Sequence, residues 1–197
     1  MNNIERFTLE EEDIYSINYE KNNFSNKTVK NKTIKNCELD TCEISNSIYE
    51  NVFFENITFQ NCDFSNTRFT DCSFREIIFE NCKMVGTNYN NCHFTKIEIN
   101  NSQCKYLNLI DLKTKELNIK NTNLRESSFY NVSFNKVMFD NNDFTQTEFI
   151  NTLLSGIDFS TSIIESIKVT EKGLKGIKVN SFQAIDLARL LGIEIIE

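Results

Sequence analysis

An apolar residue at every fifth position is the feature that most constrains how this chain can fold. In the stretch NCDFSNTRFTDCSFREIIFENC, residues 61–82, the side chains of Phe64, Phe69, Phe74 and Phe79 recur at intervals of five. A helix returns to the same side every three or four residues and a strand every two, so neither element explains this spacing. The repeating unit must therefore be a structure of its own.

The five-residue register runs through most of the chain. From Phe24 to Val179 every fifth residue, which we call the centre of its unit, is large and apolar except Cys104 and Thr114. The residue two places before a centre is mostly small or β-branched, and the residue two places after it is often Asn. Such Asn residues are Asn51, Asn56, Asn61, Asn66, Asn81, Asn91, Asn101, Asn121, Asn131, Asn141 and Asn151. A five-residue unit cannot bury its own apolar side chains, so the units must stack as a solenoid.

Four units of five residues would make a square coil of twenty residues. Large centres would then stack along the axis, and Asn would suit the outward corners because it tolerates left-handed backbone angles. This pattern resembles the pentapeptide repeat family, whose members form a right-handed quadrilateral β-helix. The resemblance covers about residues 23–180 and implies an all-β solenoid of about eight coils. We expect residues 1–22 to form an amino-terminal cap or an imperfect first coil.

Residues 181–197 leave the register and predict a short helix followed by a short strand. Ser181 suits the start of the helix and Gly192 its end. At 100° per residue, one apolar sector that would close the last coil contains Ala184, Ile185, Leu187, Ala188 and Leu191. The opposite sector contains Phe182 and Leu190 beside Gln183, Asp186 and Arg189. An apolar pair on the outer side indicates a partner surface.

The carboxyl-terminal stretch GIKVNSFQAIDLARLLGIEI resembles that of the Qnr and MfpA type of pentapeptide repeat proteins. Proteins of that type bind DNA gyrase and related type II topoisomerases and lessen quinolone action. The resemblance implies a homodimer through the carboxyl-terminal capping segment. The interface residues that it implies are Phe182, Ile185, Leu187, Leu190 and Leu191. A monomeric cap with no partner is the alternative.

Charge is distributed unevenly between two neighbouring sides of the expected coil. The acidic face flanks the centres Leu39, Phe59, Phe79, Ile99, Ile119, Phe139 and Phe159, and it carries Glu38, Asp40, Glu80, Glu98, Asp140 and Asp158 against Lys120 and Lys178. The basic face flanks the centres from Ile34 to Leu174, and it carries Lys35, Arg75, Lys96, Lys113, Lys115, Lys136 and Lys175 against Glu55, Glu76 and Glu116. A row of carboxylates rising ~4.8 Å per coil loosely resembles phosphates ~3.4 Å apart along a DNA strand.

The sequence contains no pattern typical of an enzyme or of a metal or cofactor site. Six of the seven Cys take the small inward place and Cys104 takes a centre, so they are expected to be reduced core residues. His93 is the only histidine and has no organised nucleophile near it. The net charge of −7 argues against direct binding of nucleic acid. With no signal-like or membrane-spanning apolar run, a cytoplasmic protein is expected.

The sequence leaves two functions open. The first is a DNA-mimicking protein that binds DNA gyrase or topoisomerase IV and modulates its activity or quinolone sensitivity. No insertion interrupts the repeats, so the acidic face and a dimer would be its only means of contact. The second is a structural or adaptor scaffold whose flat sides bind another protein, since the repeat by itself specifies only a scaffold.

Overall fold

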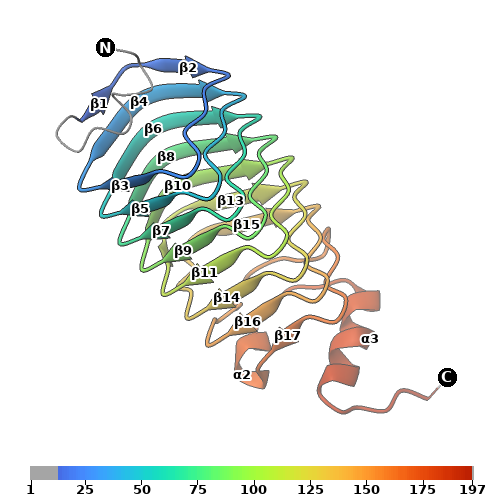
Figure 1. Ribbon diagram of the computed structural model, residues 1–197. Coiled ribbons are helices and arrows are strands. Elements are labelled where there is room, and N and C mark those ends of the chain that lie inside the picture. The colour runs from blue at the N-terminus through green and yellow to red at the C-terminus, as the bar shows by residue number, and fades with distance from the viewer. Residues whose placement is uncertain (1–12, 197) are drawn as a thin grey trace.

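The chain forms a rod of stacked coils, shown from its amino-terminal to its carboxyl-terminal end in Figure 1. This computed structural model describes residues 13–196. It confirms the predicted β-solenoid of about eight turns with parallel sheets. The part of the amino-terminal prediction that concerns residues 1–12 lies outside the described residues.

Strands pair in parallel with those one coil away, twenty residues along the chain, and make two sheets. The nine-stranded sheet contains β1 (Ile14–Tyr15), β2 (Asn18–Glu20), β4 (Thr33–Asp40), β6 (Phe53–Gln60), β8 (Ser73–Glu80), β10 (His93–Asn100), β12 (Lys113–Thr114), β13 (Leu117–Lys120) and β15 (Val137–Asp140). The eight-stranded sheet contains β3 (Thr28–Lys30), β5 (Ile48–Glu50), β7 (Arg68–Thr70), β9 (Asn88–Asn90), β11 (Asn108–Ile110), β14 (Ser128–Tyr130), β16 (Glu148–Ile150) and β17 (Lys168–Val169). The acidic and basic faces both belong to the nine-stranded sheet, because strands such as β4 and β6 run around the corner between them.

Corners of the coil have the left-handed backbone that the recurrent Asn predicts. Asn61, Asn121 and Asn151 have φ of 53°, 51° and 51°. The same angle occurs at residues of other types, for example Lys96 and Lys136. Position in the coil therefore imposes the angle, and Asn is the residue that adopts it at least cost.

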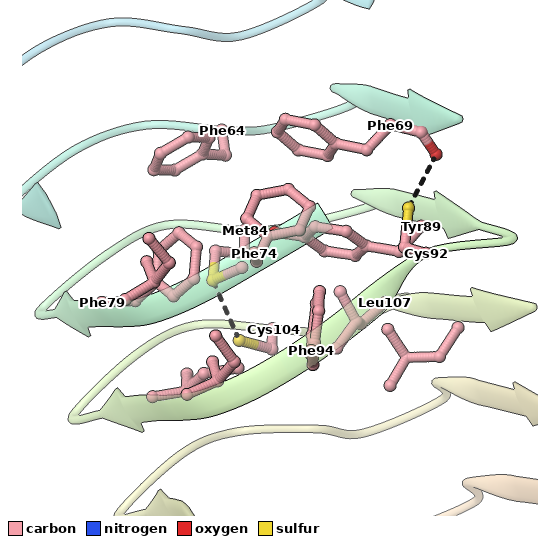
Figure 2. Close-up of a cluster of buried hydrophobic side chains, with 14 of the residues drawn as sticks. Phe64, Phe69, Phe74, Phe79, Met84, Tyr89, Cys92, Phe94, Cys104 and Leu107 are labelled. Atoms are coloured by element: carbon pink, nitrogen blue, oxygen red, sulfur yellow. Dashed lines mark hydrogen bonds between the residues drawn. The ribbon is translucent and has the colours of Figure 1, made fainter. Parts of the chain in front are cut away.

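The core is a set of aromatic and aliphatic columns along the axis. Tyr49, Phe69 and Tyr89 stack in successive coils with ring centroids 5.0 and 4.8 Å apart. Phe69 also meets Phe74 of the next column edge to face, at 5.3 Å and 80°. Figure 2 shows how such rings fill the inside of the rod together with Met84 and Cys104. Stacked and edge-to-face pairs are the arrangements that aromatic rings prefer.

The carboxyl-terminal end departs from the prediction in several respects. A short helix, α2 (Glu171–Leu174), replaces the last part of the expected pentad run. Thr170 caps it by accepting a hydrogen bond from the Gly173 N–H at 3.2 Å. The predicted helix is present as α3 (Ser181–Leu190), but residues 193–196 after it form no strand.

Helix α3 begins one residue earlier than expected and is rotated about its axis. Asn180, not Ser181, is the cap, and it exchanges two hydrogen bonds with Gln183 of 3.0 and 2.9 Å. The Gln183 amide, predicted to point outward, is buried and donates to the carbonyls of Phe159 and Ser162 at 2.9 and 2.6 Å. Gln183 and Leu187 are therefore the side chains that seal the last coil.

Candidate functional site

The six predicted carboxylates of the acidic face lie on one side of the rod, but they differ in how they are engaged. Glu38 and Glu98 are exposed, and neither has a side-chain partner among residues 13–196. Asp40 accepts a hydrogen bond from the Asn61 amide at 2.9 Å. Glu80 accepts the equivalent bond from Asn101 at 2.7 Å. These two acids thus tie one coil to the corner of the next while keeping their charge.

The last two carboxylates lie toward the carboxyl-terminal end. Asp140 forms an ion pair with Lys120, with 3.5 Å between Oδ2 and Nζ. Asp158 accepts hydrogen bonds from Ser160, one from the backbone N–H at 2.9 Å, and these bonds lower the pKa of its carboxyl. The charge density on this face is lower than that of DNA, which has one phosphate per ~1.7 Å of duplex.

The structure adds three residues to this face that the sequence interpretation did not use. Glu20 pairs in register with Asp40, so it extends the acidic face by one coil. It was missed because residues 1–22 were assigned to a cap, although Tyr19 is in phase. Ile78 and Met138 also point outward here, with 37% and 53% of their surfaces exposed, and they interrupt the row of acids.

The basic face is partly neutralised by ladders of ion pairs. Glu55 lies between Lys35 and Arg75 of the neighbouring coils, with N–O distances of 2.8 and 3.4 Å. The hydrogen bond from Lys35 is the main cause that lowers the pKa of Glu55. Lys96 pairs with Glu76 at 2.7 Å. Each pair links residues twenty apart, so stacking of the coils creates it.

Helix α3 has an apolar outer surface. Phe182 is 80% exposed, and Ile185, Leu190 and Leu191 are also exposed. Leu187, which the sequence places both in the sector that closes the last coil and in the dimer interface, is buried against the last coil and only 8% exposed, so it closes the coil and is not part of the exposed surface. Ile185 and Leu191, along with Ala184, were expected to close the coil and face solvent instead.

The residues weighed for chemistry do not converge on a centre. All seven Cys are buried, and each of Cys42, Cys62, Cys72, Cys82 and Cys92 donates its thiol to a carbonyl 23 residues earlier. His93 is exposed on the basic face. Within residues 13–196 no group of three or more His, Cys, Asp or Glu is arranged to hold a metal ion. The helices of this part of the chain are too short and too polar to cross a bilayer.

These features define a class of protein: a β-solenoid with a filled core, in which only the outward side chains distinguish one side of the rod from another. The model for the pentapeptide repeat region matches residues 32–109, and that for pentapeptide repeats in eight copies matches residues 118–156. The chain belongs to the pentapeptide repeat family.

Two solved structures are similar to this chain at low sequence identity. A trypsin-treated variant of QnrB1, described as a plasmid-mediated fluoroquinolone resistance protein, is 19% identical with a TM-score of 0.50, covering 92% of this chain and 98% of its own. HetL from the cyanobacterium Nostoc sp. strain PCC 7120, described as involved in heterocyst differentiation regulation, is 11% identical with a TM-score of 0.39, covering 82% and 86%. A comparison with curated protein sequences gave no match.

Proposed function

We propose that this protein mimics DNA and binds the DNA-binding surface of a type II topoisomerase such as DNA gyrase or topoisomerase IV. The observation that carries the proposal is the acidic face, on which the six predicted carboxylates from five coils lie on one side of the rod, while the coils centred on Phe59 and Ile119 contribute none. Long-range attraction between such a face and a basic DNA-binding surface speeds encounter. The resemblance to the Qnr and MfpA type points to the same partner.

A homodimer through α3 belongs to this proposal. The exposed Phe182, Ile185, Leu190 and Leu191 form an apolar surface at the end of the rod, and a second copy would cover it. Eight coils at ~4.8 Å make a rod of roughly 38 Å. Two rods joined end to end would span about 75 Å, comparable with about 22 base pairs at ~3.4 Å.

The second candidate function is an adaptor scaffold that binds a different protein. Ile78 and Met138 favour it, because exposed apolar side chains among the acids suit a protein surface better than a phosphate-binding one. A partner that binds both the carboxylates and these exposed apolar side chains would present apolar side chains between basic ones.

The first function is tested by a DNA supercoiling assay with purified gyrase. We expect the protein to inhibit supercoiling, or to relieve quinolone inhibition, at micromolar concentration. Replacing Glu38→Gln and Glu98→Gln removes two exposed charges with no structural partner, so the fold should be retained. The half-effective concentration should rise about tenfold, in line with roughly 0.5–1 kcal/mol for each charge lost from a binding surface.

Glu165→Gln is the matched control, since Glu165 is exposed and lacks a side-chain partner within the described chain but lies on another side of the coil. It should leave the effect on gyrase unchanged. A protein without any influence on supercoiling or quinolone action would exclude the topoisomerase proposal and leave the adaptor function.

A further inference from the structure

The basic face changes character halfway along the rod. Its lysines and arginine in the first coils are paired with Glu55 and Glu76. Lys113, Lys115 and Lys136 are exposed instead, and no carboxylate among residues 13–196 lies within 4.0 Å of their ammonium groups. Three positive charges without an ion-pair partner among residues 13–196 therefore gather on a molecule whose net charge is −7.

These lysines lie on adjacent coils. Lys113 and Ser133 form a parallel β-bridge. The Leu117 N–H donates to the Lys136 carbonyl at 3.1 Å, so Lys136 follows directly in the next coil. Glu116 is the nearby acid at the corner, and it reduces the local positive charge without pairing to any of the three.

The sheet is also interrupted at this place. In β4, β6, β8 and β10 eight residues run without a break, whereas the next coil is split into β12 and β13. Thr114 supplies a small side chain where the other coils have Phe, Ile or Leu, and its Oγ1 accepts a hydrogen bond from the Asn135 N–H at 3.3 Å. Unlike Lys96 and Lys136, Glu116 does not have a positive φ.

A hollow of about 260 Å³ lies beside the lysines. It is lined by Asn131, Val132, Ser133, Phe134, Asn151 and Leu153. Lys113, Ser133 and Leu153 occupy equivalent places in successive coils, so Lys113 borders the hollow, and Lys115 and Lys136 follow along the same side of the rod. Leu153 is 57% exposed. The volume is below the roughly 300–1,000 Å³ of small-molecule pockets and suits a single apolar side chain.

We propose that Lys113, Lys115, Lys136 and this hollow bind an extended acidic peptide segment that places one apolar side chain against Leu153 and Phe134. Positive charge and an apolar recess side by side fit that chemistry. The acidic face shares the same sheet, so a nucleic acid lying over the basic face would meet repelling carboxylates. A single peptide strand is only about 4.8 Å wide and avoids them.

Fluorescence anisotropy with a labelled hexapeptide of five glutamates and one phenylalanine, placed third, tests the proposal. The double variant Lys113→Gln/Lys115→Gln should weaken binding about tenfold, and Glu116→Gln should tighten it about twofold. Leu153→Asn should abolish the preference for this peptide over a hexaglutamate. Arg68→Gln, which removes an exposed unpaired cation elsewhere, should have no effect.

The substituted side chains are exposed, except for Glu116, which is half-buried, and circular dichroism should give the same spectrum for each variant. Absence of peptide binding, or binding that ignores both the lysine and the Leu153 substitutions, would overturn the proposal. Tighter, lysine-dependent binding of a six-nucleotide single-stranded DNA would also overturn it, because that result would identify a nucleic acid as the preferred ligand.

Discussion

Small inward side chains do more than fit beside the wall of the rod. The hydroxyl groups of Thr67, Thr87 and Thr147 donate to the carbonyl of the centre 23 residues earlier, at 2.8, 2.9 and 2.7 Å. The Cys thiols make longer bonds of the same kind, such as that from Cys92 to Phe69 in Figure 2. Each bond satisfies a buried carbonyl, so these residues join one coil to the previous one.

The hydroxyl groups of two buried tyrosines, by contrast, are not satisfied by a hydrogen bond within residues 13–196. Tyr49 and Tyr89 are each 1% exposed, and their hydroxyl groups have no hydrogen-bond partner within the described residues. Burial raises the pKa of both phenols. An unpaired buried hydroxyl costs about 1–3 kcal/mol.

We therefore expect Tyr89→Phe to increase the free energy of unfolding by about 1 kcal/mol. The ring keeps its stacking on Phe69, and only the unpaired oxygen is removed. Urea denaturation followed by circular dichroism measures the change. Tyr130→Phe is the control, since the Tyr130 side chain is exposed and its hydroxyl has no partner among the described residues, so the substitution should show almost no effect. A less stable Tyr89→Phe protein would mean that the hydroxyl does have a partner.

At this scale the sequence predicted which residues are buried but not all of their roles. The period of five was sufficient to place the centres, because a single apolar side chain per unit has only one way to face the axis. It could not show that Thr67 bonds the Ile44 carbonyl, since that contact depends on the offset between coils. The small size of these side chains therefore predicts their inward position correctly, but it does not predict the hydrogen bonds that they make.

Corner residues are the elements that set the direction of the chain. Asn121 donates to the Asn101 amide oxygen at 3.0 Å and accepts from the Asn141 amide at 2.8 Å. Such a ladder binds three coils along one edge of the rod. The backbone of Asn121 has a φ of 51°.

Two substitutions at Asn121 separate the ladder from the backbone angle. Asn121→Gly loses the ladder but accepts the left-handed angle, whereas Asn121→Val loses the ladder and adds roughly 1–2 kcal/mol of backbone strain. We expect both substitutions to lower the free energy of unfolding, and the valine variant to lose roughly 1–2 kcal/mol more than the glycine variant. Urea denaturation measures both losses, and the valine variant should have the lower midpoint. Equal midpoints would show that the angle at this corner carries no strain.

Helix α3 shows why an end is harder to predict than a repeat. A helical wheel fixes the spacing of Gln183 and Leu187 but not which side meets the coil. That choice follows from the carbonyls of Phe159 and Ser162, which the Gln183 amide satisfies. The two carbonyls at the open end of the rod need a hydrogen-bond donor, so the side of the helix that carries Gln183 faces the coil. The apolar side chains on the other sides of the helix are therefore exposed to solvent.

The proposed dimer is tested on this helix. Phe182→Asp places a charge at the most exposed apolar residue of α3, so sedimentation should show half the mass of the unchanged protein. Tyr130→Asp replaces an exposed aromatic residue in the middle of the rod and should leave the mass unchanged. An unaltered mass for Phe182→Asp, or a monomeric unsubstituted protein, would exclude this interface.

On the scale of the whole molecule, acid-base behaviour follows from the filled core. Burial raises the pKa of the Cys37 and Cys104 thiols. The folded chain then holds these protons to a higher pH than the unfolded chain, whose thiols titrate near ~8.5. Their contribution to stability is complete below that pH and is lost as the pH rises above it.

Stability should therefore fall on going from pH 7.5 to pH 10. Each fully buried thiol contributes a loss of about 1.4 kcal/mol per pH unit above the unfolded pKa. Urea midpoints measured in the presence of a reducing agent check the prediction. Cys104→Ala should reduce the slope, and a midpoint independent of pH would contradict the burial of the thiols.

The sequence predicts which residues lie on each face of the rod, but not which of their side chains are paired. Sorting outward residues by coil placed Glu38 and Glu98 together correctly. It gave no sign that the Asp40 carboxylate is bonded to Asn61, or that Lys113 lacks a partner while Lys35 has one. Those differences arise from side-chain reach between neighbouring coils, which a period does not encode.

The coil of twenty residues has a consequence for how such a surface can change in evolution. Removing residues 61–80 would delete one full coil and leave every later side chain facing as before. Removing only five residues, for instance 61–65, would preserve the core pattern but turn all later sides by a quarter revolution. The carboxylates that now lie on the same side as Glu38 in later coils would then lie on a different side of the rod. A short deletion could therefore rearrange the surface charges without disturbing the core.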